Sequence, residues 1–204
     1  MTGTRRTAAA GLEALVDEYI QELRPERESE LSKFRSVRTD KDAISYAALA
    51  RDPETGKKHP HQYRIPPASL EESKRRLLKN LSRVRSTKPF QELIELVDRH
   101  IRPIDRVGEL TVYDTALRIG ARFGSEPEKV YIHAGTRNGM RKLGLDSRDE
   151  TIEMNELPAP IRRKLRPREA EDFLCVYKDA FATVKTGERP AASSRSHGRT
   201  RLST

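Results

Sequence analysis

A short turn that leads into an amphipathic helix, in the segment PIDRVGELTVYDTALRIG, carries residue types that suit a phosphate group. Gly108 lets backbone amides point outward with no Cβ in the way, and the first turn of the following helix has N–H groups without intrahelical acceptors. With the positive end of the helix dipole, these groups form an anion site. We therefore predict that Arg106, Val107, Gly108 and Thr111 hold a nucleic-acid phosphate; the alternative is a turn that only joins two helices.

Clusters of Lys and Arg could hold further phosphates beside this turn. One basic run without acidic residues covers residues 74–88, and a second covers residues 162–168. The individual candidates for phosphate contact are Lys79, Arg83, Arg137, Arg141 and Lys142. Like charges on one helix repel each other, and a polyphosphate would relieve that repulsion. The alternative is a solvated face whose charges pair with neighbouring acids.

Acid–base chemistry would need residues such as those in the segment EPEKVYIHAGTRNG. The candidates are Glu128, Tyr131 and His133. Residues two apart on a helix do not share a face, so Tyr131 and His133 should point to different sides, whereas Arg137 lies one turn beyond His133. Asp114 from the preceding helix could join them in a pocket that holds a phosphate or a flipped base. The alternative is a buried polar network that ties helices together.

The longest irregular segment, residues 51–67, contains three further candidates. Its prolines and glycine forbid a continuous helix, and loops of this length are often functional. His59 and His61 could bind a metal, but no cysteine or second histidine pair at zinc spacing accompanies them, so we predict neither metal nor cofactor. We expect these histidines and Arg64 to contact phosphate or a neighbouring helix. The single cysteine, Cys175, has apolar neighbours and should lie in the core.

Helical periodicity extends over nearly the whole chain and determines where these residues lie. The predicted helices cover residues 12–23, 40–50, 69–84, 90–101, 109–123 and 125–143, and a last helix begins at Pro167. Pro25 should stop the first helix, and capping boxes at Ser69–Glu72 and Ser125–Glu128 should open two others. No segment has a clear strand pattern, so the sequence predicts an all-α, multi-helix fold.

Glycine spacing and composition predict the packing and the domain boundaries. Gly135 and Gly139 lie one turn apart inside a predicted helix, where each costs about 1 kcal/mol relative to alanine. Another helix, or else a ligand, should therefore approach that face closely. We predict one helical domain at 1–184, with a hairpin motif at 90–123, and a basic, disordered tail at 185–204.

The predicted hairpin resembles the helix-hairpin-helix motif of a DNA glycosylase superfamily. Members typically show a turn of the form hydrophobic-Pro-Gly-hydrophobic-Gly-x-x-Thr-Ala, which is matched at Ile104, Val107, Gly108 and Thr111. Arg106 replaces the first glycine, Leu110 replaces the lysine of members with lyase activity, and no aspartate opens the helix after the hairpin. The resemblance therefore implies DNA binding without glycosylase chemistry. The segments ELTVYDTALRIG, YIHAGTR and EDFLCVYK also resemble a bacterial protein family, which implies no function.

Charge and composition favour the same partner. The chain has 204 residues and a net charge of +9, a balance that favours nucleic acid or an anionic surface. One cysteine, no leader-like N-terminus and no long apolar run predict a cytoplasmic protein with no membrane contact. We predict a DNA-binding protein, without catalysis, that holds the duplex backbone. The alternatives are a nucleic-acid enzyme related to base-excision glycosylases and a scaffold that binds a protein partner.

Overall fold

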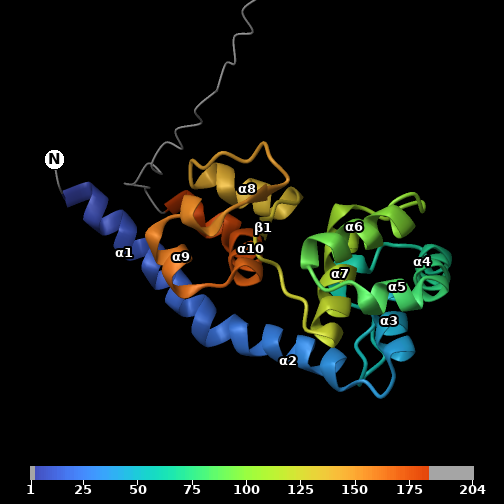
Figure 1. The fold of residues 1–204 in the computed structure, drawn as a ribbon. Coiled ribbons are helices and arrows are strands. Elements are labelled where there is room, and N and C mark those ends of the chain that lie inside the picture. The colour runs from blue at the N-terminus through green and yellow to red at the C-terminus, as the bar shows by residue number, and fades with distance from the viewer. Residues whose placement is uncertain (1–2, 184–204) are drawn as a thin grey trace, which may run out of the picture.

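The structure, a computed structural model, describes the backbone of residues 3–183 and the side chains of residues 11–181. The predicted tail at 185–204 lies outside the described residues. The described chain is mostly helical, which confirms the all-α fold class (Figure 1). No helix in this part of the chain is long and apolar enough to cross a membrane. The α-helices are α1 (Gly3–Glu18), α2 (Arg24–Ser36), α3 (Asp40–Ala48), α4 (Pro67–Lys79), α5 (Leu81–Ser86), α6 (Phe90–Ile101), α7 (Glu109–Phe123), α8 (Ala134–Lys142), α9 (Ala159–Lys164) and α10 (Pro167–Val176).

The described helices enclose two large hydrophobic cores, and a small third cluster contains Ala50, Ile65 and Leu70. The first core lies among α2 to α7 and includes Phe34 and Phe90, and the second lies among α1, α8, α9 and α10 and includes Tyr19 and Phe173. We call residues 24–123, which begin with α2, the first lobe, and residues 11–23 with 124–181 the second lobe. Figure 1 shows α7 and α10 facing each other where the two lobes meet. The seam between the lobes can therefore bring together residues far apart in the sequence.

A nearly continuous helical segment runs along both lobes and contradicts the predicted stop at Pro25. The π-helical turn η1 (Tyr19–Leu23) follows α1, and α2 begins directly after it. Pro25 lies in the first turn of α2, where a missing N–H breaks no intrahelical hydrogen bond. The proline therefore begins a new helix, and the segment continues from the second lobe into the first (Figure 1).

The predicted helix at 125–143 is wrong in its first half. Residues 126–129 are not helical, and Val130–Tyr131 forms a short strand, β1, that pairs antiparallel with β2 (Thr151–Ile152). Strands of two residues are too short for periodicity to show in a sequence. Helix α8 begins only after His133, whose backbone is extended, and Gly144, at φ 71°, ends it as predicted.

The two glycines of α8 allow close packing against α10, so the predicted close approach to that face is made by a helix. A Cβ added to Gly139 would overlap the carbonyl oxygen of Leu174, and one added to Gly135 would overlap the sulfur of Cys175. Because α8 approaches α10 this closely, the residue before α8, His133, comes within contact of α10 side chains.

The predicted capping box at the start of α4 does not form. The helix begins at Pro67, with Pro66 as its N-cap and no side-chain cap. Ser69 is buried inside the helix, and Glu72 instead receives hydrogen bonds from Arg75 and Arg76. Proline at the first helical position, with its fixed φ, starts this helix two residues earlier than the serine would.

Candidate functional site

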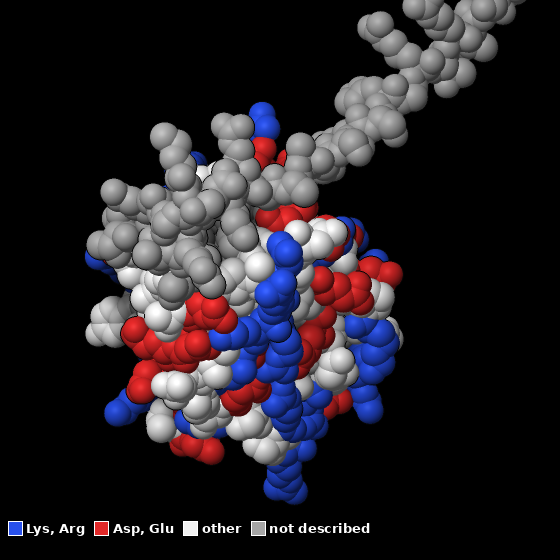
Figure 2. All heavy atoms as spheres, turned by 90° about the vertical axis from the view of Figure 1, so that its left-hand side faces the viewer, with Lys and Arg blue, Asp and Glu red and all other residues white. Residues whose placement is uncertain are grey.

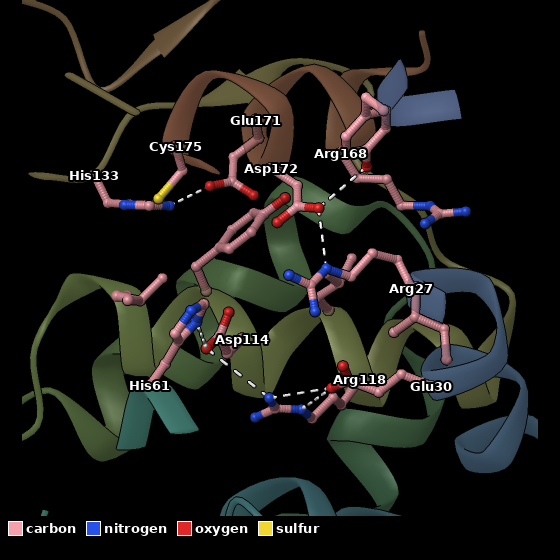
Figure 3. Close-up of a pocket in the computed structure, with 15 residues that line it drawn as sticks. Arg27, Glu30, His61, Asp114, Arg118, His133, Arg168, Glu171, Asp172 and Cys175 are labelled. Atoms are coloured by element: carbon pink, nitrogen blue, oxygen red, sulfur yellow. Dashed lines mark hydrogen bonds and ion pairs between the residues drawn. The ribbon is translucent and has the colours of Figure 1, made fainter. Parts of the chain in front are cut away.

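A cavity of about 80 Å³ lies between the lobes, and most of its lining is charged or polar. The first lobe contributes α7 and the 3₁₀ turn η2 (Pro60–Gln62), and the second lobe contributes α10 and His133. Figure 3 shows His133, Glu171 and Asp172 on one side of this interlobe cavity and His61, Asp114 and Arg118 on the other. Histidines and carboxylates from five separate segments thus surround one small space.

On the first-lobe wall, Asp114 of α7 receives contacts from three groups. The amide of Gln62 donates a hydrogen bond to its carboxylate, His61 Nδ1 lies 3.7 Å from Oδ2, and an Arg118 nitrogen lies 3.9 Å away. Burial opposes ionisation of Asp114, but the His61 hydrogen bond and the Arg118 charge outweigh it and lower the carboxyl pKa. The Asp114 hydrogen bond also raises the pKa of His61. Asp114 is therefore held as a carboxylate.

Arg118 and Glu30 extend this wall deeper into the first lobe. Arg118 is 6% exposed, and one of its nitrogens lies 3.4 Å from Glu30. Its Nη1 has no hydrogen-bond partner among the described residues. His59 Nδ1 lies 3.3 Å from Glu30, and burial together with Arg118 lowers the pKa of His59. The loop 51–66 is therefore fixed to α2 and α7 by its histidines.

On the second-lobe wall, His133 and Glu171 form a buried pair. His133 Nε2 contacts Oε1 of Glu171, and the Thr136 hydroxyl lies 3.0 Å from the same oxygen. Burial raises the pKa of the Glu171 carboxyl. Burial also opposes the charged form of His133, but the hydrogen bond to Glu171 outweighs it and raises the pKa of His133. Both pKa shifts favour protonation. The pair therefore retains one shared proton to a higher pH than a solvent-exposed histidine or glutamate would.

Asp172 links the second-lobe wall to α2 and so joins the lobes. Arg27 Nε lies 3.1 Å from Asp172 Oδ2, and the Tyr19 hydroxyl donates to the same oxygen at 3.2 Å. Burial, reinforced by Asp172, raises the pKa of Tyr19 far above its ordinary value. The cavity wall is therefore also a structural joint between α2 and α10.

Tyr113 lies between the cavity and a second, larger hollow. This hollow, which we call the groove, has a volume of about 800 Å³ and lies between the α6–α7 hairpin and the β1–α8 region. Tyr113 and His133 line both spaces. The Tyr113 hydroxyl is buried and has no hydrogen-bond partner among the described residues. Burial raises its pKa, so the hydroxyl stays protonated and can donate a hydrogen bond.

The predicted pocket of Tyr131, His133, Arg137 and Asp114 is divided between these two spaces. His133 and Asp114 line the cavity, whereas Tyr131 and Arg137 line the groove with His133. Arg137 does not offer its guanidinium freely, because the carbonyl oxygens of Ser147 and Ile132 accept hydrogen bonds from it. Tyr131 donates to Gln91 of α6 at 2.6 Å. These two residues therefore brace the groove.

The predicted phosphate turn joins α6 to α7, whose bounds match the predicted 90–101 and 109–123. Ile104 and Val107 are buried in the first core, and Gly108 is an exposed N-cap with no side-chain cap. Arg106 has φ 64° at the position where the resembled motif has glycine. A left-handed backbone at that position explains why glycine would suit it. Val107 and Thr111, both buried, position the turn and do not expose side chains to a ligand.

The first basic run is partly neutralised. Lys74 pairs with Glu71, Arg75 and Arg76 pair with Glu72, and Arg85 lies 3.2 Å from Asp40. The exposed residues of this run without an ion pair among the described residues are Lys79, Arg83 and Lys88. Only these three remain available for an anionic partner.

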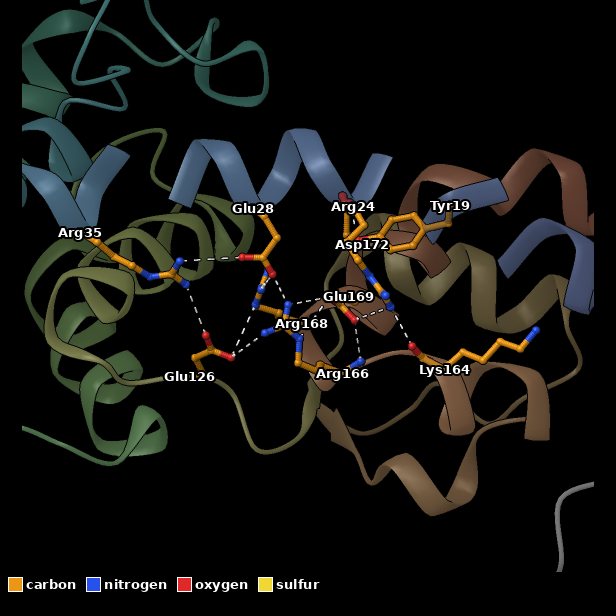
Figure 4. A network of polar contacts seen from close by, with 10 residues as sticks. All are labelled: Tyr19, Arg24, Glu28, Arg35, Glu126, Lys164, Arg166, Arg168, Glu169 and Asp172. Carbon is orange, nitrogen blue, oxygen red and sulfur yellow. Dashed lines mark hydrogen bonds and ion pairs between the residues drawn. The ribbon is translucent and has the colours of Figure 1, made fainter. Parts of the chain in front are cut away.

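The second basic run is partly neutralised: Lys164 pairs with Asp17 within the second lobe, and Arg166 and Arg168 form ion pairs between the lobes. Arg166 and Arg168 both contact Glu28 of α2, and Arg166 also pairs with Glu169 at 2.7 Å. Figure 4 shows these residues, with Glu126 beside them, in one network. Figure 2 shows a stripe of Lys and Arg on one face with Asp and Glu along both sides. Glu169 is a neighbour in the sequence, but Glu28 and Glu126 lie about 40 to 140 positions away from the arginines, so the sequence could not show them as partners.

The remaining candidates lie apart from the cavity. Glu128 is exposed and lines neither space, and Lys142 pairs with Asp179 at 2.7 Å, whereas Arg141 is exposed. Arg64 is exposed as well. Cys175 lines the cavity and is not a core residue, and burial raises its thiol pKa to about 11.

Sequence reasoning missed Glu171, Asp172, Arg118, Glu30 and Arg27. One signal was available: Glu171 lies one turn before Leu174 and Cys175, so it falls on an apolar face of its helix. A charge on such a face is buried with a partner. No three His, Cys, Asp or Glu side chains within residues 11–181 are grouped to hold a metal ion.

Comparisons with protein-family models, curated proteins and solved structures gave no match to this chain.

Proposed function

We propose that the protein binds DNA, with a backbone phosphate at the turn before α7 and a single base in the interlobe cavity. The observation that carries this proposal is that one helix supplies both places. Gly108 is exposed at the start of α7, and Leu110, Tyr113 and Asp114 of the same helix line the cavity. Six residues of helix separate Gly108 from Asp114 by roughly 9 Å. A nucleotide held at the turn therefore lies close to the cavity mouth.

The chemistry of the cavity suits a base. The Tyr113 hydroxyl and Arg118 Nη1 are buried donors without a partner in the described part of the chain, and Asp114 and Glu171 are acceptors. A base presents both donors and acceptors on its edge and is read by such groups between aromatic and apolar side chains. Leu31 and Leu110 supply apolar lining.

Binding at the turn should depend on salt. Arg106 is 74% exposed at its side chain, and Lys79 and Arg83 are exposed without ion pairs among the described residues. Each phosphate that these residues neutralise releases counterions, so log K should fall with log salt at a slope of about −0.9 per contact. Fluorescence anisotropy with a 20-base-pair duplex tests this. Absence of binding at low salt would overturn the proposal.

A gain-of-function variant tests whether DNA enters the cavity. Leu110→Lys would place an amine in the lining, where it can form a Schiff base with the aldehyde of an abasic site. Borohydride reduction should trap Leu110→Lys, and not the wild type, on duplex DNA that carries one abasic site. If DNA binds but Leu110→Lys and the wild type are both trapped only at the same background level, the base does not occupy this cavity.

A second candidate function is hydrolysis of an N-glycosidic bond, favoured by two carboxylates with opposite pKa shifts in one cavity. Asp114 is held ionised and Glu171 shares a proton with His133. Such a divergence typically separates the acid from the base. Water would bond to the sugar C1′ and give a proton to Asp114, while the departing base nitrogen takes the shared proton. His133 precedes α8, the helix whose start carries aspartate in the resembled family.

Base release from duplexes with defined lesions tests the second candidate. Glu171→Gln and Asp114→Asn should each abolish release, and Asp179→Asn, an exposed acid outside the cavity, should not. If the protein binds these duplexes but releases no base from any of them, the hydrolysis candidate is ruled out and the DNA-binding proposal remains.

A further inference from the structure

The Tyr63 side chain projects from the protein surface into solvent because of the way its neighbours are packed. Its exposed fraction is 76%, the largest of any large hydrophobic residue whose side chain is described. Gln62, just before it, is 1% exposed, and Ile65, two residues later, is 7% exposed. Since both neighbours point inward, the loop leaves the Tyr63 ring in solvent. A single exposed ring is common on protein surfaces, so the loop that carries Tyr63 decides what the ring can bind.

The loop that carries Tyr63 is well anchored. Lys58 Nζ donates to the carbonyl oxygens of Tyr63, at 3.2 Å, and of Ile65, at 2.7 Å. The His59 amide donates to Ala50, and its ring stacks on Phe34 with centroids 6.3 Å apart. A ring on an anchored loop loses little conformational entropy when a partner packs on it.

The same loop reaches the interlobe cavity. His61 and Gln62 both contact Asp114, which lines the cavity, and Tyr63 follows them directly. The segment is also basic: Lys57 and Arg64 are exposed and have no ion pair among the described residues. No acidic residue lies between positions 55 and 70. An aromatic ring among cations is the combination that recognises stacked bases and their phosphates.

We propose that Tyr63 stacks on a base of the bound nucleic acid next to the base in the cavity, while Lys57 and Arg64 contact the flanking phosphates. This inference rests on the proposed function, because it concerns the same bound strand. It adds a contact surface on loop 57–64 that is separate from the turn before α7. When one base enters the cavity, the base next to it loses a stacking partner and exposes a face to Tyr63. The preferred ligand is therefore a duplex with one unpaired nucleotide, whose base can leave the stack.

The chain contains no tryptophan, which provides a direct test. Tyr63→Trp creates a single tryptophan, whose emission a stacked base should quench. Titration with a duplex that carries one unpaired adenine should reduce the emission of Tyr63→Trp. Val176→Trp, at the other exposed large hydrophobic position, is the matched control and should keep its emission. Binding measured by anisotropy together with unchanged Tyr63→Trp emission would overturn the inference and leave the proposed function intact.

Affinity gives a second measure. Tyr63→Ala should weaken binding of the same duplex by about 5- to 150-fold, the range for loss of one base–aromatic stack. Tyr63→Phe should bind within about twofold of the wild type, because the ring remains. Unchanged binding by Tyr63→Ala would overturn the inference. Absence of DNA binding by the wild type at low salt would instead overturn the proposed function. If Tyr63→Ala keeps its DNA affinity but loses a protein partner that the wild type binds, the loop is a protein-binding surface and the inference is overturned.

Discussion

Two histidine–carboxylate pairs face each other across the interlobe cavity and differ in their exposure to water. The His61 side chain is half exposed and approaches Asp114, whereas His133 and Glu171 are both nearly inaccessible. The Asp114 carboxyl pKa is lowered and the Glu171 carboxyl pKa is raised. Asp114 has Gln62 and Arg118 beside it, whereas Glu171 contacts the His133 ring and the Thr136 hydroxyl.

The difference between the pairs shows that surroundings, and not residue type, assign the proton. A carboxylate that accepts several hydrogen bonds near a guanidinium stays ionised, whereas one buried with a single titratable partner tends to share a proton. The two walls therefore offer an acceptor on the first lobe and a proton donor on the second. Substitutions on each wall should therefore have different effects.

The largest expected effect comes from removing the buried acid. Glu171→Ala should lower the free energy of unfolding by about 3–5 kcal/mol, because it leaves His133 buried without its partner. Asp114→Ala should lower the free energy of unfolding by less, because water can reach His61 and solvate it after the carboxylate is removed. Urea unfolding measures both. If Asp114→Ala costs more than Glu171→Ala, the second-lobe pair is not the more buried one.

Asp179→Ala is the matched control for that comparison. Its carboxylate, which pairs with Lys142, is 82% exposed at the side chain. Exposed pairs contribute at most about 1 kcal/mol. In addition, His133→Leu combined with Glu171→Leu should recover much of the loss, because neither partner is then left unpaired.

Glycine substitutions should show the second-lobe wall to be the more tightly packed. Gly139→Ala should cost about 1–3 kcal/mol, since the added Cβ meets the backbone of Leu174 in a packed helix. In Gly120→Ala, in α7, the added Cβ overlaps the carbonyl oxygen of Ser125 by less than the Cβ of Gly139→Ala overlaps the carbonyl oxygen of Leu174. Thermal unfolding of the two variants should show the larger loss for Gly139→Ala; equal losses would contradict the difference in packing.

The pH dependence of stability should locate the first-lobe pair. The hydrogen bond with Asp114 raises the pKa of His61, so its contribution to stability is complete below about pH 6.5 and is lost as pH rises through the folded pKa. The difference in unfolding free energy between wild type and His61→Gln should therefore fall as the pH rises above about 6.5. This difference in unfolding free energy should stay below about 1 kcal/mol, because the His61 side chain is half exposed. A difference that grows with pH would contradict the pairing.

The smallest expected effect concerns Cys175. Burial, with the Glu171 charge second, raises its thiol pKa to about 11, so iodoacetamide should react slowly at pH 8. Glu171→Gln removes the second of these causes and should speed alkylation by about twofold. Alkylation in guanidine, which exposes the thiol in both proteins, serves as the control. An unchanged rate in Glu171→Gln would place the acid farther from the thiol than we infer.

Local sequence patterns predicted the hairpin helices well. The bounds of α6 and α7, the glycine that ends α8 and the helix packing at Gly135 and Gly139 all follow from apolar spacing and backbone freedom. The same reasoning failed at Pro25 and Ser125, where the local signals suit more than one structure. A proline can start or stop a helix, and a serine can precede a strand as well as a helix.

The site itself depended on distant contacts. The sequence by itself determined that the chain is helical and basic and that His133, Asp114 and the loop histidines carry usable chemistry, because periodicity and residue type are local properties. Only the tertiary structure decided that Glu171 meets His133 and that Asp172 meets Arg27, 38 and 145 positions away in the chain. It also decided that Arg166 and Arg168 are paired, because burial and partner distance, which set charge and pKa, exist only once the lobes pack together.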